Sequence, residues 1–412
     1  MQSRFLKAPL AAYLSSSPPT TTTTTMTAST TATALAAAAD ASSIGNVVAG
    51  TKNRSVTTST LDHVRSNLVL PTREETLRRD SKVYEFWNTN DKLLEKAWKE
   101  WDNSDPKALK LPTLDDSIIN PKLRDAMNRA WEIIGSSHNE DGMNVDPTGT
   151  CANYDEHDKE KVFEEVENNI KELWEEVAPG VYAIQFFDLN EIHKIQEWFA
   201  AVSESGIPTR PPYGIVLNRQ GFMIDPRSIG YLGSPKFQDF YMNTLINSYV
   251  RPLGRLFYPK FIQQHDDSES FAFSIQYQAG GDESIRHHTD ASTITFNINL
   301  DLEQTWTGSS LYFWNSETHE RNEVEWKPGY AIMHLGRTLH AATPIKSGTR
   351  SNLVMWTFGT KTNMAYGSSG SPLTLDDGSY PEEYQMKPQD RWTKPSESSS
   401  SNVASWDRWS PF

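Results

Sequence analysis

Two histidines and one aspartate in this chain have the types and order of a metal site. His288-Thr289-Asp290 is followed further along by His340. A non-heme iron centre that activates oxygen needs two imidazoles and one carboxylate on one side of the metal, with the other side open. Residues two apart in an extended strand point the same way, so His288 and Asp290 can reach one ion while His287 and Thr289 face away. We expect His288, Asp290 and His340 to be metal ligands and the catalytic centre.

An arginine follows this set. Arg350 opens an apolar run at residues 353–356. Its planar guanidinium is suited to a bidentate grip on a carboxylate. An arginine that faces the interior has little purpose unless an anion binds there. We therefore expect Arg350 to hold the carboxylate of a cosubstrate in the same region as the metal.

The segments between these residues have the pattern of an antiparallel β structure. Short runs rich in β-branched and aromatic residues are separated by glycine and Pro-Gly turns, which is typical of a β-meander or jelly roll. The runs are residues 293–300, 310–314, 330–335 and 339–345. A lone His-x-Asp is common by chance. The prediction therefore depends on the ordered set of residues together with these strands.

Several motifs in this region resemble the prolyl-4-hydroxylase-type 2-oxoglutarate and iron(II)-dependent dioxygenases, over about residues 181–360. The motifs are Tyr277-Gln278-Ala279-Gly280-Gly281, His288-Thr289-Asp290, Gly308-Ser309-Ser310-Leu311-Tyr312-Phe313, Lys327-Pro328-Gly329, residues 340–344 and Gly348-Thr349-Arg350. Residues 212–219, 225–227 and 273–278 are similar to a plant and algal subgroup of the Incurvata/Cupuliformis type, which is associated with chromatin.

The resemblance implies an α+β fold with a double-stranded β-helix (jelly roll) core and supporting helices. It implies iron ligation by His288, Asp290 and His340, with Arg350 on the distal carboxylate of 2-oxoglutarate. Tyr277 and Asn299 fall where such enzymes place further cosubstrate contacts. Many relatives carry a hydroxyl two residues after the arginine, where this chain has an asparagine at 352. The source of the second contact to the distal carboxylate is therefore open.

The activity implied by the resemblance is that of a dioxygenase using Fe(II), 2-oxoglutarate and O2, with ascorbate as reductant. Such an enzyme hydroxylates, or oxidatively demethylates, a protein or small-molecule substrate and releases succinate and CO2. Two alternatives stay open. One is a catalytically weak or inactive β-barrel adaptor in chromatin complexes, against which the complete ligand set argues. The other is a cupin-like metalloprotein that does not use 2-oxoglutarate, against which Arg350 argues.

The rest of the chain divides by composition. Residues 1–80 are dominated by Ser, Thr and Ala, with six threonines at 20–25, and resemble either an organellar transit peptide or a disordered tail. We expect a helical region at 81–180, the dioxygenase region at 181–360 with its core at about 268–360, and a Ser/Pro-rich tail at 361–412. The location is open between nucleus and plastid or mitochondrion.

Three helices are expected from periodicity and capping residues. Val83–Trp101 and the apolar stripe at residues 162–177 have helical spacing, and Trp98, Trp101 and Trp174 are expected in the core. A third helix begins at Ser234-Pro235 and ends near Pro252 and Gly254.

Charge and composition limit the classes of partner. The net charge of −14 argues against direct nucleic-acid binding and permits a basic protein partner. The chromatin association of the subgroup favours a nuclear or histone protein as substrate. No segment approaches the roughly 18 to 20 apolar residues of a membrane helix, so no membrane association is expected. Cys151 is the only cysteine, which excludes an intrachain disulfide.

Overall fold

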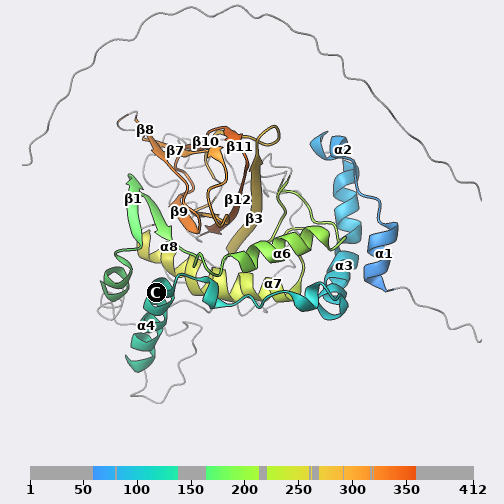
Figure 1. Ribbon diagram of the computed structural model, residues 1–412, viewed down its shortest axis with the longest axis horizontal. Coiled ribbons are helices and arrows are strands. Elements are labelled where there is room, and N and C mark those ends of the chain that lie inside the picture. Colours follow the sequence, from blue (N-terminus) through green and yellow to red (C-terminus); the bar gives the residue numbers. More distant parts are fainter. Residues whose placement is uncertain are drawn as a thin grey trace, which may run out of the picture. The chain divides into compact units, whose positions relative to one another are not determined.

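The computed structural model describes residues 59–78, 81–137, 164–212, 220–258, 261, 269–290, 292–315, 318 and 320–358 (Figure 1). The predicted tails at residues 1–58 and 361–412, the residue Cys151, and most of the 212–219 motif lie outside these ranges. The sequence expectations for those segments therefore stay predictions.

Two antiparallel sheets form the core of the fold. The larger sheet has the strand order β1-β2-β9-β5-β12-β3, and the smaller has the order β4-β10-β7-β8. The larger sheet contains β1 (Trp174–Ala178), β2 (Val181–Gln185), β3 (Glu269–Gln278), β5 (Ile294–Asn299), β9 (Tyr330–Leu335) and β12 (Thr349–Phe358). The smaller contains β4 (Ile285–His288), β7 (Leu311–Trp314), β8 (Arg321–Val324) and β10 (His340–Ala342). Two short strands, β6 (Thr307–Gly308) and β11 (Ile345–Ser347), pair separately.

The chain passes back and forth between the two sheets, which makes the core a jelly roll. It runs from β3 to β4, back to β5, across to β7 and β8, back to β9, across to β10 and back to β12. The α+β class and the double-stranded β-helix core expected from the sequence are therefore confirmed. Every described strand pairing is antiparallel.

Along the strands of the larger sheet, successive side chains point alternately toward the helices and toward the space between the two sheets. On β5, Phe296 and Ile298 belong to one hydrophobic cluster together with the helices. Thr295 precedes Phe296 and Asn299 follows Ile298, so both point to the opposite face, between the sheets. The interior face also carries Ile332 of β9 and Trp356 of β12, which pack in the second cluster. Polar side chains are therefore concentrated inside the barrel.

A layer of helices covers the outer face of the larger sheet (Figure 1). It contains α6 (His193–Glu204), α7 (Pro235–Asp239), η4 (Phe240–Val250) and α8 (Arg251–Phe257). Ser234 caps α7 by accepting a hydrogen bond from the backbone N–H of Phe237, as its sequence predicted. The predicted end near Pro252 and Gly254 is wrong. Pro252 lies in the first turn of α8, where its missing N–H is not needed.

The helix expected at Val83–Trp101 is confirmed as α3 (Ser81–Ser104), and Trp98 and Trp101 are buried in the core. It is followed by α4 (Pro121–Ser137). The single helix expected across residues 162–177 is wrong. Residues 164–170 are helical, but a turn follows and Trp174–Ala178 forms β1, which pairs with β2 across a turn at Gly180. Cross-strand pairing there overrides the helical spacing.

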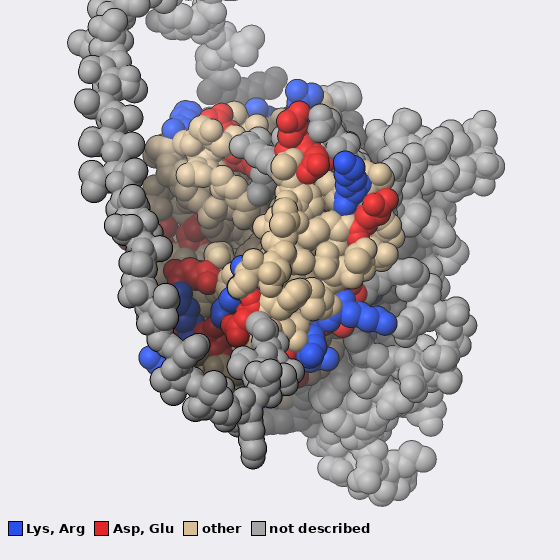
Figure 2. Space-filling view, turned by 90° about the vertical axis from the view of Figure 1, so that its right-hand side faces the viewer, with Lys and Arg blue, Asp and Glu red and all other residues tan. Residues whose placement is uncertain are grey.

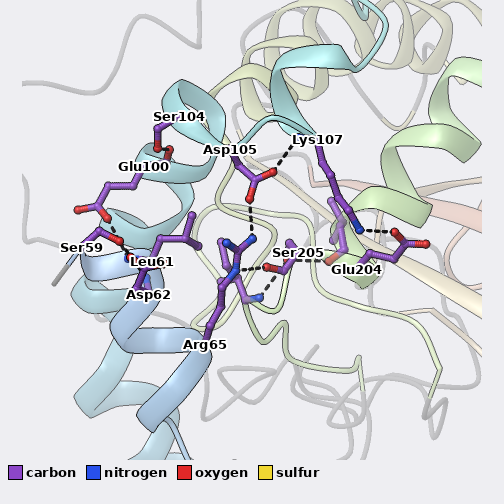
Figure 3. Close-up of polar contacts among 12 residues, drawn as sticks. Ser59, Leu61, Asp62, Arg65, Glu100, Ser104, Asp105, Lys107, Glu204 and Ser205 are labelled. Carbon is purple, nitrogen blue, oxygen red and sulfur yellow. Dashed lines mark hydrogen bonds and ion pairs between the residues drawn. The ribbon is translucent and has the colours of Figure 1, made fainter.

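The interpretation of residues 1–80 as a transit peptide or disordered tail is wrong for residues 60–78. They form α1 (Thr60–Asn67) and α2 (Arg73–Arg78). Leu61 and Val64 are buried in the core. Arg65 donates hydrogen bonds to the Asp105 carboxylate and to the Ser205 carbonyl oxygen, both at 2.7 Å, and so joins α1 to the ends of α3 and α6 (Figure 3). Tertiary contacts, rather than helix propensity, account for this order.

None of the helices in the described ranges is long and apolar enough to cross a membrane.

Candidate metal centre

The two predicted histidine ligands lie side by side on the smaller sheet. Strands β4 and β10 pair antiparallel, and His288 and His340 are direct partners in the register. Their ring centroids are 4.3 Å apart. Asp290 follows β4, and its backbone N–H donates to the carbonyl oxygen of Gly336 at 2.8 Å. Strand pairing therefore brings His340 beside His288 and Asp290, which are close to each other but distant from it in sequence.

The ligand atoms of these three residues lie within 4.8 Å of one another. His288 Nε2 is 3.5 Å from Asp290 Oδ1, and His340 Nε2 is 3.8 Å from Asp290 Oδ2. Nitrogen and oxygen ligands bind divalent transition metals at roughly 2.0 to 2.2 Å, so two ligands of one ion lie up to about 4.4 Å apart. The donor set and these spacings fit one divalent ion held by two imidazoles and a carboxylate.

Backbone carbonyls fix the tautomer of both histidines. His288 Nδ1 lies 2.7 Å from the Arg286 oxygen, and His340 Nδ1 lies 2.9 Å from the Thr338 oxygen. A carbonyl oxygen can only accept, so Nδ1 carries the proton in each ring. In the neutral ring Nε2 then has a lone pair that can ligate a metal.

Asp290 is held as a charged ligand. Thr295 on β5 donates its hydroxyl to Asp290 Oδ2 at 2.6 Å, and the Ser292 hydroxyl lies 2.8 Å from that of Thr295. Burial alone would raise the pKa of the Asp290 carboxyl, but the imidazoles of His340, His288 and His334, in their protonated forms, lower this pKa below its usual range. The carboxylate is therefore ionised and oriented before any metal binds.

The two histidines differ in their readiness to protonate. Burial lowers the pKa of His340 to about 3. For His288, partial burial lowers the pKa, but the neighbouring Asp290 raises it more, and the net shift is upward. His340 is therefore neutral at pH 7, while His288 is the ring at which protons compete with a metal.

Arg350 is buried inside the barrel, as its place on β12 next to interior residues requires. Its side chain is 1% exposed. Its Nε donates to Ser309 Oγ at 3.1 Å and its Nη1 to Asn352 Oδ1 at 2.7 Å. Burial lowers its pKa to about 10, so the guanidinium keeps its charge at neutral pH. No carboxylate of the described residues lies within ion-pair distance of it, which makes this position a candidate anion site.

Two aromatic rings enclose the guanidinium. Its carbon lies 4.4 Å from the centroid of Tyr277 and 4.6 Å from that of Trp326. Tyr277 is the register partner of Arg350 on β3, and burial raises its pKa to about 12. Rings at these distances stabilise a desolvated cation and exclude water from it.

The resemblance implied that Tyr277 and Asn299 make further contacts to the cosubstrate. The structure brings Tyr277 into contact with the guanidinium. Asn299 lies beside Asn352, whose Oδ1 accepts a hydrogen bond from Arg350. The Nδ2 of Asn299 is 3.5 Å from Asn352 Oδ1 and 2.8 Å from Asp301 Oδ2. Metal binding by His288, Asp290 and His340 stays a prediction. Cosubstrate binding by Arg350, Tyr277 and Asn299 also stays a prediction.

The sequence interpretation missed two residues of the site. Ser309 has a left-handed backbone, with φ of 61°, and presents its hydroxyl to Arg350. His334 on β9 is fully buried, and its Nε2 lies 3.8 Å from Asp290 Oδ2. The signal for His334 was available. It alternates with Met333, which faces the helices, so it had to face the interior with Ile332.

No profile of a known protein family matches the chain. The chain is 30% identical over 202 residues to a zebrafish (Danio rerio) protein named 2-oxoglutarate and iron-dependent oxygenase domain-containing protein 2. The match covers 46% of this chain and 53% of that protein. The Xenopus tropicalis protein of the same name is 31% identical over 186 residues, covering 43% and 48%. These relatives support a 2-oxoglutarate and iron-dependent oxygenase family, which is a family of oxidoreductases.

The narrower plant and algal subgroup is not confirmed. An Arabidopsis thaliana protein, 2-oxoglutarate and iron-dependent oxygenase domain-containing protein ICU11, is 25% identical over 209 residues, covering 46% of this chain and 48% of that protein. The zebrafish and Xenopus proteins have higher identity, at 30% and 31%. The chain spans about half the length of the curated relatives it matches.

Among solved structures, a Pseudomonas putida prolyl-4-hydroxylase is 16% identical, with a TM-score of 0.31, and the match covers 44% of this chain and 88% of that one. A likeness this low carries no argument about function.

Proposed function

We propose that this protein is a 2-oxoglutarate- and Fe(II)-dependent dioxygenase that hydroxylates, or oxidatively demethylates, a protein or small-molecule substrate. The observation that supports this most strongly is the pairing of two sites inside one barrel. One is a metal triad with an ionised carboxylate, and the other is a buried guanidinium without a carboxylate partner among the described residues. A dicarboxylate that chelates a metal at one end needs both.

The chain's own residues would prepare the reaction. His288 and His340 offer Nε2 lone pairs, and Asp290 offers a charged oxygen that Thr295 orients. Iron(II), when bound, supplies the redox chemistry that couples decarboxylation of 2-oxoglutarate to oxidation of a substrate C–H bond. Arg350 fixes the far carboxylate, and the rings beside it keep water away, which strengthens that contact.

We propose that Ser309 provides the hydroxyl that the sequence comparison left without a source. Asn352 occupies the usual place, but its Oδ1 already accepts a hydrogen bond from Arg350 and its Nδ2 donates to Asn297 at 2.7 Å. Ser309 Oγ reaches the same guanidinium from another strand connection. A left-handed backbone at a non-glycine residue is strained and is found where function requires a fixed side chain. The hydroxyl can donate to a carboxylate that Arg350 holds.

The substrate and partners are also matters of proposal. A nuclear or histone protein, ascorbate as reductant, and membership of the plant and algal subgroup are all consistent with the motifs. On the face shown in Figure 2, acidic and basic side chains alternate without a broad basic patch. That face is therefore better suited to a protein or small molecule than to nucleic acid, which binds to clustered Lys and Arg.

One observation favours the cupin-like alternative. A third imidazole, that of His334, lies near the same carboxylate, with its Nε2 3.8 Å from Asp290 Oδ2, although the ligand atoms within 4.8 Å of one another are those of His288, Asp290 and His340. Such a protein would bind metal but would have no need of 2-oxoglutarate. The role of Arg350 separates the two candidates, because only the dioxygenase requires an anion beside it.

The proposed function is tested by product analysis. The purified 412-residue chain is incubated with iron(II), 2-oxoglutarate, ascorbate and nuclear or plastid protein extracts. We expect succinate release together with a mass shift of about 16 Da, or loss of methyl groups, in a specific peptide. The matched control is Asp290→Ala in the same extracts. Equal succinate release by both forms would contradict the proposal.

A further inference from the structure

Asn297 is a polar side chain at the centre of the barrel interior. It lies on β5, the strand between β9 and β12 in the larger sheet. Its register partners on those strands, Ile332 and Val354, belong to the interior hydrophobic cluster, so Asn297 faces the interior as well. Both partners are buried, but Asn297 is partly exposed. Because helices cover the other face of β5, this exposure is to space inside the barrel.

This position lies between the two ends of the proposed site. Two residues before Asn297, and on the same face, Thr295 donates its hydroxyl to the carboxylate of Asp290. Toward the other end, Asn352 on β12 accepts a hydrogen bond from the guanidinium of Arg350. Successive residues on one face of a strand are about 6.6 Å apart. A ligand that extends from the metal triad to Arg350 therefore passes Asn297.

A chain of hydrogen bonds fixes the orientation of the Asn297 amide. Arginine only donates, so the oxygen of the Asn352 amide faces Arg350, at 2.7 Å from Nη1. The nitrogen of the same amide donates to Asn297 Oδ1, also at 2.7 Å. Asn352 pairs with Asn299, on the side of the anion site. Asn297 Oδ1 therefore points toward Arg350, and its Nδ2, on the other side of the planar amide, points toward the metal triad.

The Nδ2 of Asn297 is a donor that the protein does not use. Among the described residues, the one side-chain hydrogen bond of Asn297 is the bond that its Oδ1 accepts from Asn352. The side chains that flank it on the neighbouring strands, Ile332 and Val354, are apolar. An apolar residue would pack better between them. A carboxylate is a strong acceptor for an N–H group in such surroundings, so an anionic ligand would complete this position.

We propose that Asn297 is a positioning residue that donates a hydrogen bond from Nδ2 to the metal-end carboxylate of a 2-oxo acid. The inference rests on the proposed function, since the ligand must chelate a metal at His288, Asp290 and His340. Together with Arg350, Asn297 gives each carboxylate of 2-oxoglutarate a donor of its own. The donor at the metal end determines the side of the triad on which that carboxylate lies.

The test compares two 2-oxo acids on the 412-residue chain loaded with iron(II) in the absence of oxygen. 2-Oxoglutarate has both carboxylates. 2-Oxobutyrate has the same keto group and metal-end carboxylate but ends in a methyl group. Each gives a visible charge-transfer band when it chelates iron(II), and the midpoint of the titration gives its affinity. We expect Asn297→Ala to weaken both acids by the same factor, at least about tenfold, because a hydrogen bond to a charged group is lost.

Two further variants and a control sharpen this comparison. Asn297→Asp keeps the size and an oxygen that accepts from Asn352 but places a negative charge near the ligand, so both acids should bind more weakly still. Arg350→Ala should weaken 2-oxoglutarate far more than 2-oxobutyrate. Gln276→Ala is the matched control. The Gln276 amide bonds to Ser351 Oγ at 3.2 Å on the face turned away from the interior, so neither affinity should change.

Equal losses for the two acids in both Asn297 variants, with unchanged iron(II) affinity, support the inference. A loss for 2-oxoglutarate alone would mean that Asn297 contacts the distal carboxylate, and no loss for either acid would mean that it contacts neither. Losses that follow a loss of iron(II) affinity would mean that Asn297 only supports the triad. Each of these three results overturns the inference and leaves the proposed function in place.

The wild-type titrations separate the inference from the proposed function. A band with 2-oxoglutarate but none with 2-oxobutyrate would overturn the inference alone, because the metal end would then have no donor that binds a carboxylate by itself. Absence of a band with either acid would overturn both.

Discussion

Two parts of the barrel interior are built in opposite ways. The metal end contains His288, Asp290 and His340, and the anion end contains Arg350 and the residues around it. The metal end is made at strand termini and the loop after β4, and the His288 side chain is 32% exposed. The anion end lies within the ten-residue strand β12, where Arg350 pairs with Tyr277 of β3, and is 1% exposed. One end is open to exchange with solvent, and the other is closed and fixed.

The two ends also carry opposite unmatched charges. Asp290 is ionised and lies beside three imidazoles and the Thr295 hydroxyl, while the hydrogen-bond partners of Arg350 among the described residues are neutral. A buried charge without a counterion is costly, so each end is completed by a ligand of the opposite sign. The difference shows that one barrel is prepared for a cation and an anion at separate places.

Removal of a metal ligand should have the largest effect. We expect His288→Ala and Asp290→Ala to abolish turnover and metal binding while the fold is retained, because these residues lie at the edge of the interior and contribute little to the core. Succinate release and circular dichroism measured on the same samples test this. Loss of folded structure in both variants would mean that the centre is structural.

Arg350→Ala should affect the anion end alone. A charge-assisted hydrogen bond contributes about 1.5 to 3 kcal/mol, and the unpaired anion adds to the loss, so 2-oxoglutarate affinity should fall by roughly two orders of magnitude or more. Arg350→Lys should restore only part of it, because a point charge does not reproduce the bidentate fork. Metal affinity should be unchanged. Arg337→Ala, which removes a guanidinium stacked on Phe261 instead, is the control.

Ser309→Gly should have a smaller effect at the same end. Glycine tolerates the positive φ of this position, so the variant removes the hydroxyl without adding backbone strain. One hydrogen bond of about 0.5 to 1.5 kcal/mol corresponds to a loss of roughly 2- to 13-fold in 2-oxoglutarate affinity. Isothermal titration measures it. An unchanged affinity would show that the second contact to the carboxylate comes from elsewhere.

A separate effect concerns the pH dependence of the stability of the metal-free protein. The folded pKa of His340 is about 3, below its ordinary value of 6.5, so between these values the unfolded state binds more protons. Stability should therefore fall as pH drops from 6.5 toward 3, by at most about 1.4 kcal/mol per pH unit from this group. Thermal unfolding at pH 7, 6 and 5 tests it. The His340→Asn variant should show a shallower dependence, and an equal slope would contradict the assignment.

The ordered motif predicted the jelly roll and the convergence of His288, Asp290 and His340 because strand alternation and antiparallel return are local rules. Residues 60–78 and the β1 strand were misread because their order depends on contacts made far away in sequence. Arg65 binds Asp105 and Ser205, and β1 pairs with β2. The hydrophobic periodicity of one segment carries no information about such contacts.

The missed site residues have the same explanation. His334 and Ser309 are separated from the motif by strands, and their roles depend on where β9 and the β6 connection lie beside β5 and β12. A histidine in an apolar strand is a weak signal by itself, because most such residues are satisfied core groups. His334 differs from that class because its Nε2, 3.8 Å from Asp290 Oδ2, has no hydrogen-bond partner among the residues that the structure describes.

The central claim is that one ligand spans both ends of the interior, and anaerobic titration of the iron(II)-loaded 412-residue chain with 2-oxoglutarate tests it most directly. A keto acid that chelates iron(II) gives a visible charge-transfer band, which neither partner shows alone. We predict that the band grows to saturation at one 2-oxoglutarate per iron and that Arg350→Ala shifts its midpoint by about a hundredfold. Tight iron binding with no band at any 2-oxoglutarate concentration would contradict the claim.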